Sequence, residues 1–126
     1  MTVAAAGSFE SEQRPGRSSA DPFAGSGGGK TSARWVHIEP GARRNAHRHP
    51  DSEEIVFVAD GSGAVWLDGT FHVLSAGSWV RIPRGVPHAT VTADAAGITL
   101  ACFFPHPDLD ANLEELDVAI PEMEAP

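Results

Sequence analysis

The chain has 126 residues and a formal net charge of −8, with 17 acidic and nine basic side chains. This length fits one domain, and nucleic-acid binding is disfavoured because phosphate contacts need a cationic face that the sequence lacks. The acidic balance also argues against anionic membranes, and no stretch reaches the roughly 20 apolar residues of a membrane span. We therefore expect a soluble protein with a small-molecule partner and with neither a nucleic-acid nor a membrane partner.

The chain contains one cysteine, Cys102, so it cannot form a disulfide within itself. Cys102 lies in the apolar run 98–104, where we expect its side chain to act as a small buried hydrophobic group. Residues 1–10 have neither the basic start nor the long apolar stretch of a secretory signal. These features together predict a cytoplasmic protein.

Residues 1–29 are rich in Gly, Ser, Ala and Pro and show no hydrophobic period. This composition is typical of a flexible segment, so we expect a mobile arm over 1–29 whose last third lies against the domain. The domain itself is expected at 30–106, followed by an acidic tail at 107–126. Within the tail, residues 108–116 are expected to form a short helix with Asp108 or Asp110 as its N-cap.

Residues 30–106 consist of short strand-like segments separated by turn signals. No helical period lies between them, which argues against a parallel α/β sheet, and many short strands indicate an all-β sandwich or barrel. The pair Asp68-Gly69 is typical of a two-residue hairpin turn. The expected strands are 34–39, 54–59, 63–67, 70–74, 78–82, 88–92 and 98–104.

Four side chains have the type and spacing of metal ligands. In a strand, His47 and His49 point to the same face because side chains alternate with a period of two. Glu54 begins the most apolar strand and shares a face with Val56, so its carboxylate would be buried and would need a cation to offset its lost hydration. His88 follows a turn rich in Pro and Gly and begins another strand. The pattern predicts one metal ion held by His47, His49, Glu54 and His88.

The other polar candidates have weaker support. His72 and His106 are expected at the surface, and His37 is expected to be a packing residue. Strand parity makes Arg81, His37 and Thr90 candidate residues of the pocket, but no catalytic acid or base is assigned to any residue.

The segments that carry these residues resemble the two sequence motifs of the cupin superfamily. The first motif matches at Gly41, His47, His49, Glu54 and Gly61, and the second at Gly77, Pro83, Gly85 and His88. Glu53 stands one residue too early for this spacing, so it should face away from the metal. Thr92 stands where the second motif has Asn, a position that does not bind metal in cupins.

The resemblance covers about residues 33–105 and implies a double-stranded β-helix, or jelly-roll, barrel with a metal inside. Three imidazoles and one carboxylate suit Fe(II), Mn(II), Ni(II), Co(II), Cu(II) or Zn(II) better than Ca(II). Cupins with this ligand set often catalyse oxidations, so the first expectation is a dioxygenase-type oxidation of a small oxygenated organic metabolite, with iron.

Two alternatives to the dioxygenase remain open. One is a non-redox isomerase, cyclase or lyase that uses the metal as a Lewis acid, and the other is a non-catalytic cupin that only binds a small molecule. Small cupins also often pair through sheet edges, so we expect a homodimer whose contact involves the N-terminal arm or the stripe Leu109, Leu113 and Leu116.

Overall fold

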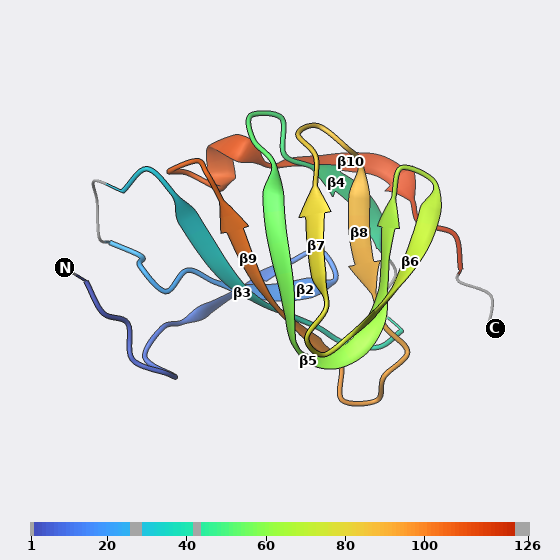
Figure 1. The fold of residues 1–126 in the computed structure, drawn as a ribbon, viewed down its shortest axis with the longest axis horizontal. Coiled ribbons are helices and arrows are strands. Elements are labelled where there is room, and N and C mark those ends of the chain that lie inside the picture. Colours follow the sequence, from blue (N-terminus) through green and yellow to red (C-terminus); the bar gives the residue numbers. More distant parts are fainter. Residues whose placement is uncertain (1, 26–28, 42–43, 123–126) are drawn as a thin grey trace.

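The computed structural model describes residues 2–25, 29–41 and 44–122, and Figure 1 shows these segments as a curled β-structure. The described residues contain ten strands and one short 3-10 turn. The elements are β1 (Ser11–Arg14), β2 (Arg17–Ala20), β3 (Ser32–Ile38), β4 (Asn45–Arg48), β5 (Glu54–Leu67), β6 (Thr70–Ser75), β7 (Trp79–Ile82), β8 (His88–Val91), β9 (Ile98–Phe104), η1 (Asp110–Asn112) and β10 (Glu114–Ala119).

Strand β5 belongs to both sheets of the barrel. Its first half pairs antiparallel with β9 and β7, and its second half pairs antiparallel with β8 and β6. The register with β9 shifts between Val58 and Asp60, and Gly61 then takes a positive φ of 82°. The sequence predicts two strands divided at this turn signal. The structure instead has one bent strand, because the bulge turns the chain without ending its pairing.

The strands on either side of this bend form two facing sheets. The first has the order β1-β2-β3-β9-β5-β7 and the second has the order β6-β5-β8-β4-β10. Apolar side chains from both sheets fill the space between them, as the alternating pattern predicts. The expected all-β jelly-roll barrel is therefore confirmed. The buried core includes Val36, Ile38, Val56, Val58, Val65, Leu74, Ile82, Ile98, Leu100 and Phe104.

Two local features of the second sheet follow from the sequence. Asp68 and Gly69 have φ values of 43° and 101° and connect β5 to β6 by the two-residue turn that the Asp-Gly pair predicts. At the end of β8, the hydroxyl of Thr92 donates to the Ser62 carbonyl at 2.6 Å and accepts the Asp94 N–H at 2.9 Å. Thr92 thus joins the end of β8 to β5 at the position where the cupin motif has Asn.

The N-terminal segment differs from the expected arm without regular structure. Residues 11–20 form the hairpin β1–β2, and β2 pairs antiparallel with β3 from Ser18 to Ala20. Main-chain hydrogen bonds to the edge of β3 hold this hairpin, and such bonds leave no hydrophobic period in the sequence. Residues 26–28 of the expected arm lie outside the described residues.

The C-terminal segment contains less helix than predicted. Only the turn η1 forms within 108–116, where the Asp108 carboxylate accepts the backbone N–H groups of Asp110 at 3.0 Å and Ala111 at 3.3 Å. The chain then continues as β10, which pairs antiparallel with β4 and covers its open edge. Residues 123–126 of the tail lie outside the described residues, and no described helix has the length and apolarity needed to cross a membrane.

Candidate metal centre

The barrel strands bring the four predicted ligands to one place. His47 lies on β4 and His49 directly follows that strand, while Glu54 and His88 are the first residues of β5 and β8. His47 and His88 are direct partners in the antiparallel pairing of β4 with β8. Because directly opposed side chains of an antiparallel pair share a face, both imidazoles point into the barrel.

The distances within this cluster are short and all four side chains are buried. One ring nitrogen from each of His47, His49 and His88 lies within 4.8 Å of the others. The Glu54 Oε1 atom lies 3.2 Å from Nε2 of His49 and 3.2 Å from Nε2 of His88. All four residues are at most 8% exposed. The structure therefore brings the three histidines together as a group that could hold a metal ion, with the Glu54 carboxylate against two of them.

Backbone carbonyl groups fix the orientation of two imidazoles. The Nδ1 atom of His49 lies 2.8 Å from the carbonyl oxygen of Asn112, and Nδ1 of His88 lies 2.9 Å from the carbonyl oxygen of Val86. A carbonyl oxygen can only accept, so each Nδ1 carries the proton in these contacts. In the neutral imidazole, Nε2 then presents a lone pair to the centre of the cluster, which is the form that binds metal.

The histidine cluster contains buried nitrogens without hydrogen-bond partners, and these indicate whether a cation would fit between the side chains. Nδ1 of His47 and the Nε2 atoms of His49 and His88 are buried and have no hydrogen-bond partner among the described residues. Buried polar atoms are nearly always paired, and lone pairs facing the Glu54 carboxylate repel it unless a proton or metal lies between them. The three histidines could thus hold a metal ion, and the residues present fit one.

The protonation states also suit metal binding. Burial by itself would raise the pKa of Glu54, but hydrogen bonds from the Nε2–H groups that His49 and His88 carry when they are protonated, together with the positive charge of these imidazoles in that form, outweigh it and lower that pKa to about 2. Burial and then the neighbouring His88 lower the pKa of His47 well below its usual value. At neutral pH the carboxylate is therefore ionised and His47 is neutral, as ligands must be.

A cavity extends from the cluster towards the N-terminal hairpin and the C-terminal turn. Its walls include Thr90 and the buried thiol of Cys102, as expected for both residues. Burial, and then the charge of Glu54, raise the pKa of Cys102 well above its usual value, so the thiol is protonated. The apolar side chains that line the cavity are Val36, Ile38, Val56, Ile82, Leu100, Phe104, Leu109 and Leu113.

Two of the candidate pocket residues lie elsewhere. The Arg81 side chain is 73% exposed, and His37 lies on the outer face of β3, where its Nδ1 contacts Thr99 Oγ1 at 2.9 Å. The prediction that these two residues line the pocket was wrong because the adjacent Ile38 and Ile82 point inward, so the period of two turns the Arg81 and His37 side chains outward.

Three other predictions concern exposure. Glu53 faces outward as expected, with its carboxylate 3.9 Å from Arg81 Nε. His72 is exposed as expected. His106 is only partly exposed, and its Nε2 lies 3.7 Å from Asp51 Oδ2.

The sequence did not reveal several polar residues around the cavity. Arg14, Arg17, Arg34 and Arg44 line it, although the first two belong to the segment expected to lack structure. Asn112 is fully buried behind His49, with its amide nitrogen 2.7 Å from Ser52 Oγ and its Oδ1 atom 2.8 Å from the Asp51 nitrogen. No spacing rule connects these residues, since they lie far apart in the chain.

Comparisons with known proteins agree with this fold. Over 89 residues the chain is 37% identical to Protein SchB of Streptomyces halstedii, which covers 67% of this chain and only 64% of that relative. The nucleoside dehydratase Pac13 of Streptomyces matches with a TM-score of 0.73 and 12% identity, covering 92% of this chain and 91% of Pac13.

A sugar phosphate isomerase of the cupin superfamily from Silicibacter pomeroyi matches with a TM-score of 0.62 and 27% identity, covering 71% of this chain and 59% of that one. The family described as the cupin domain matches residues 34–103, which contain all four clustered side chains. This match spans more than half of the sequence, and the chain therefore belongs to the cupin family.

Proposed function

We propose that this cupin is a metal-dependent enzyme that acts on a small oxygenated organic molecule. His47, His49, Glu54 and His88 would hold one divalent transition metal ion. The observation that carries the proposal is the set of three buried, unpartnered imidazole nitrogens, two of which lie 3.2 Å from the Glu54 carboxylate. A cavity opening from these atoms gives a small molecule access to them.

A dioxygenase-type oxidation is the reaction that the cavity supports best. A bound redox-active ion such as iron would supply the electron transfer that this reaction needs. The apolar side chains of Val56, Ile82 and Leu100 would keep bulk water from the centre. Among the described residues that line the cavity, the titratable groups besides the four ligands are arginines and Cys102, and the chain contains no Tyr. Guanidinium groups and buried thiols are poor proton acceptors, which favours a reaction without a separate protein base.

A non-redox reaction is the second candidate. Two of the solved structures with the same fold are named as a nucleoside dehydratase and a sugar phosphate isomerase. In such a reaction the metal would act as a Lewis acid on a substrate oxygen, and the arginines of the cavity would stabilise developing negative charge.

Oxygen consumption distinguishes the two reactions. We expect protein reconstituted with Fe(II) to consume dioxygen in the presence of small oxygenated acids, and protein reconstituted with Zn(II) to consume none. Zn(II) can polarise a substrate oxygen, but the zinc ion does not change its own oxidation state and therefore cannot transfer electrons to dioxygen. An oxygen electrode makes this measurement, with substrate loss followed by mass spectrometry.

The Zn(II) protein also serves as the control for this experiment. Substrate conversion by the Zn(II) protein without loss of dioxygen would contradict the oxidation and support the non-redox reaction. Failure of the protein to retain any transition metal would contradict both reactions and leave a binding domain.

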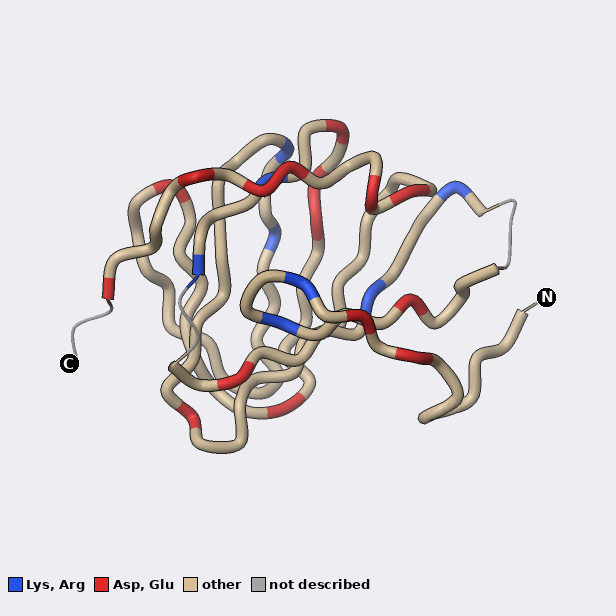
Figure 2. The backbone as a smooth tube through the Cα atoms, turned by 180° about the vertical axis from the view of Figure 1, so that it is seen from behind, with Lys and Arg blue, Asp and Glu red and all other residues tan. Residues whose placement is uncertain are grey.

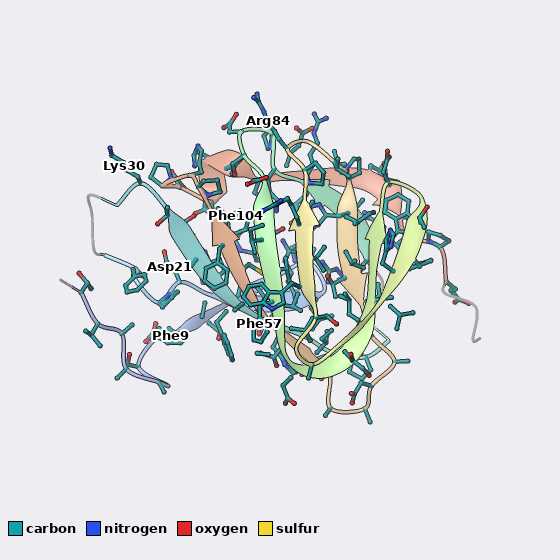
Figure 3. All side chains as sticks on the ribbon, viewed as in Figure 1. Phe9, Asp21, Lys30, Phe57, Arg84 and Phe104 are labelled. Carbon is teal, nitrogen blue, oxygen red and sulfur yellow. The ribbon has the colours of Figure 1, made fainter. Side chains whose placement is uncertain are left out.

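We also propose that the protein is a homodimer, but not through the expected stripe Leu109, Leu113 and Leu116, because Leu109 is buried and both Leu109 and Leu113 line the cavity. The outer face of the first sheet carries Trp35, Phe103 and Trp79, which are 44%, 44% and 66% exposed, and Phe57 stacks on Trp79 with ring centroids 4.6 Å apart. Figure 3 shows Phe57 in front of this sheet. Strand pairing makes Trp35, Phe57 and Trp79 neighbours across the sheet, so they form one apolar surface that a second copy would cover.

The substitution pair Trp35→Ser and Trp79→Ser is expected to convert the dimer to a monomer at micromolar concentration. Aromatic side chains supply most of the apolar area that such an interface would bury, so their loss should raise the dissociation constant by about 100-fold. Sedimentation velocity measures the change. Val73→Ser is the matched control, because Val73 is 84% exposed on β6 of the other sheet. A wild-type protein that sediments only as a monomer would contradict the proposal.

A cytoplasmic location remains part of the proposal. The single cysteine is free and buried, which is compatible with a reducing compartment but does not require one. Fractionation of the native cells would measure the location directly.

A further inference from the structure

The cavity next to the histidine cluster is lined by an unusual number of cations for such an acidic protein. Four of its eight arginines line this one cavity, although the chain has a net charge of −8. Glu54 is the only acidic residue among the described residues that line it. Figure 2 shows basic positions on the hairpin over the middle of the molecule, while most acidic positions lie around its rim. The residues that line the cavity therefore carry more positive than negative charge, in contrast to the chain as a whole.

These four arginines, called here the arginine cluster, come from separate parts of the chain and are largely buried. Arg14 and Arg17 lie on the hairpin β1–β2, Arg34 on β3, and Arg44 immediately before β4. Arg44 is 5% exposed, and the side chains of Arg17 and Arg34 are 8% and 10% exposed. Burial and the charge of Arg17 lower the pKa of Arg44 to about 10, so it is still charged at neutral pH.

Protein carboxylates neutralise the arginine cluster only from the rim. Arg14 contacts Asp110 at 2.7 Å, Arg17 contacts Glu115 at 3.1 Å, and Arg34 contacts Asp21 at 3.3 Å. These three carboxylates, and that of Glu12 at 3.7 Å from Arg14, do not line the cavity, and their side chains are 72%, 37%, 35% and 78% exposed.

Two members of the cluster have hydrogen-bonding capacity left over. Arg44 donates to the carbonyl oxygen of Thr90 at 2.9 Å, which leaves its charge without a described carboxylate partner. The Nε atom of Arg14 is buried and has no hydrogen-bond partner among the described residues.

Buried like charges repel each other, and a divalent cation at the histidines would add to the positive charge. A guanidinium presents a planar fork of N–H donors that matches the two oxygens of an oxyanion, so an anion in the cavity would offset this repulsion. The apolar walls formed by Val36, Ile38 and Leu100 would contact an uncharged remainder of the same molecule. The lining of the cavity thus combines guanidinium groups that suit an anion with imidazoles that could hold a metal ion.

We propose that the arginine cluster binds the anionic group of the substrate and that the substrate is a small organic oxyanion, a carboxylate or a phosphate ester. The anionic group lies against Arg14, Arg17, Arg34 and Arg44, and the reacting part extends to the histidines. The placement of the reacting part at the histidines rests on the proposed function. The anion subsite does not, because the arginine cluster would bind an anion whether or not a metal catalyses a reaction.

Binding of three probes with one shared ring tests the proposal. Benzoate, phenyl phosphate and benzamide are titrated by calorimetry into metal-loaded and metal-depleted wild-type protein. We expect at least one of the two anions to bind about tenfold more tightly than neutral benzamide, and to do so in both forms of the protein. The anion that binds more tightly identifies the source of the oxyanion. Equal binding of benzamide and both anions would overturn the proposal.

Charge-removing variants locate the subsite. Arg17→Gln and Arg34→Gln are each expected to weaken binding of the preferred anion about tenfold, and Arg44→Gln is expected to do the same if it remains folded. Arg81→Gln is the matched control, because the Arg81 side chain is 73% exposed and does not line the cavity. Unchanged anion affinity in both Arg17→Gln and Arg34→Gln would also overturn the proposal.

Elemental analysis of the same samples separates this proposal from the proposed function. Anion binding that depends on the arginine cluster, in a protein that retains no metal, would uphold the subsite and reject the metal enzyme. Full metal content without preferential anion binding would reject the subsite and leave the metal enzyme standing.

Discussion

Replacement of His88 by alanine is expected to weaken metal retention by about 100-fold or more and to abolish any turnover. The variant removes one of three imidazoles and leaves the Glu54 carboxylate, now with a single imidazole neighbour at 3.2 Å, in a buried site. Three ligands hold a transition ion far less tightly than four, and the loss is larger than that from changing a residue that only supports a ligand. Elemental analysis of purified protein and titration with a competing chelator measure the effect, and His49→Ala should behave in the same way.

Thermal unfolding provides an independent test of metal binding at the same site. Metal that binds only the folded protein stabilises it by mass action, so a chelator should lower the wild-type melting temperature and should change that of His88→Ala much less. His72→Ala is the matched control, since His72 is an exposed residue of β6. Full metal stoichiometry in both His49→Ala and His88→Ala would show that these side chains are not ligands.

Replacement of Asn112 by alanine is expected to lower the free energy of unfolding by about 3 kcal/mol, a large effect for a residue outside the predicted site. Asn112 is fully buried, and its side chain accepts the Asp51 N–H and donates to the Ser52 hydroxyl. Both groups would lose a partner in the loop that joins His49 to Glu54. Denaturant unfolding measures the stability.

Metal affinity should fall in the same variant, by about tenfold, because the loop held by Asn112 sets the position of His49. The backbone carbonyl that accepts His49 Nδ1 is still present in Asn112→Ala, so the effect arises from movement and not from a lost ligand contact. Asn45→Ala is the control, because Asn45 is exposed on β4. A stability equal to that of wild type would mean that water replaces both hydrogen bonds.

Most of the barrel strands and the ligand cluster could be predicted because both obey local periodicities, although the short strand β4 was not among the expected strands. Alternation along β5 distinguishes Glu54 from its neighbour Glu53: the first is 5% exposed in the barrel and the second faces Arg81 outside it. The same period places His47 and His49 on one face. A two-residue repeat is a property of any pleated strand, so it can be read from a single sequence.

The hairpin β1–β2 and the strand β10 could not be predicted because their main contacts are made by the backbone. Each adds to the edge of an existing sheet, β2 to β3 and β10 to β4. Main-chain hydrogen bonds do not depend on side-chain identity, and the strand β10 (Glu114–Ala119) is exposed along most of its length. An edge strand of this kind has no hydrophobic pattern to distinguish it from a polar tail.

The arginine cluster could not be predicted from the sequence for a different reason. Arg14 and Arg44 stand 30 residues apart. The hairpin that carries Arg14 joins the first sheet through the pairing of β2 with β3, whereas Arg44 precedes β4 of the second sheet, and the two segments meet only because both sheets line one cavity. The net charge of the whole chain is negative and therefore suggests the opposite sign, because it is dominated by acidic side chains outside the cavity. Net charge describes the surface as a whole and says nothing about the sign of charge inside a cavity.

The candidate ligands and several of the cavity-lining residues come from different parts of the chain, and this separation has an evolutionary consequence. The four candidate ligands lie between residues 47 and 88, whereas Arg14, Arg17, Leu109 and Leu113 bring the chain ends to the cavity. On the proposed function, mutations at these four positions would alter which molecules are accepted without replacing a candidate ligand, whereas Asn112 of the C-terminal segment supports His49 and would have to be kept. If the proposed function holds, substrate preference would diverge between descendants of this gene through these positions while the four candidate ligands are inherited unchanged, and exchanging the hairpin β1–β2 between two such descendants should change their preferences.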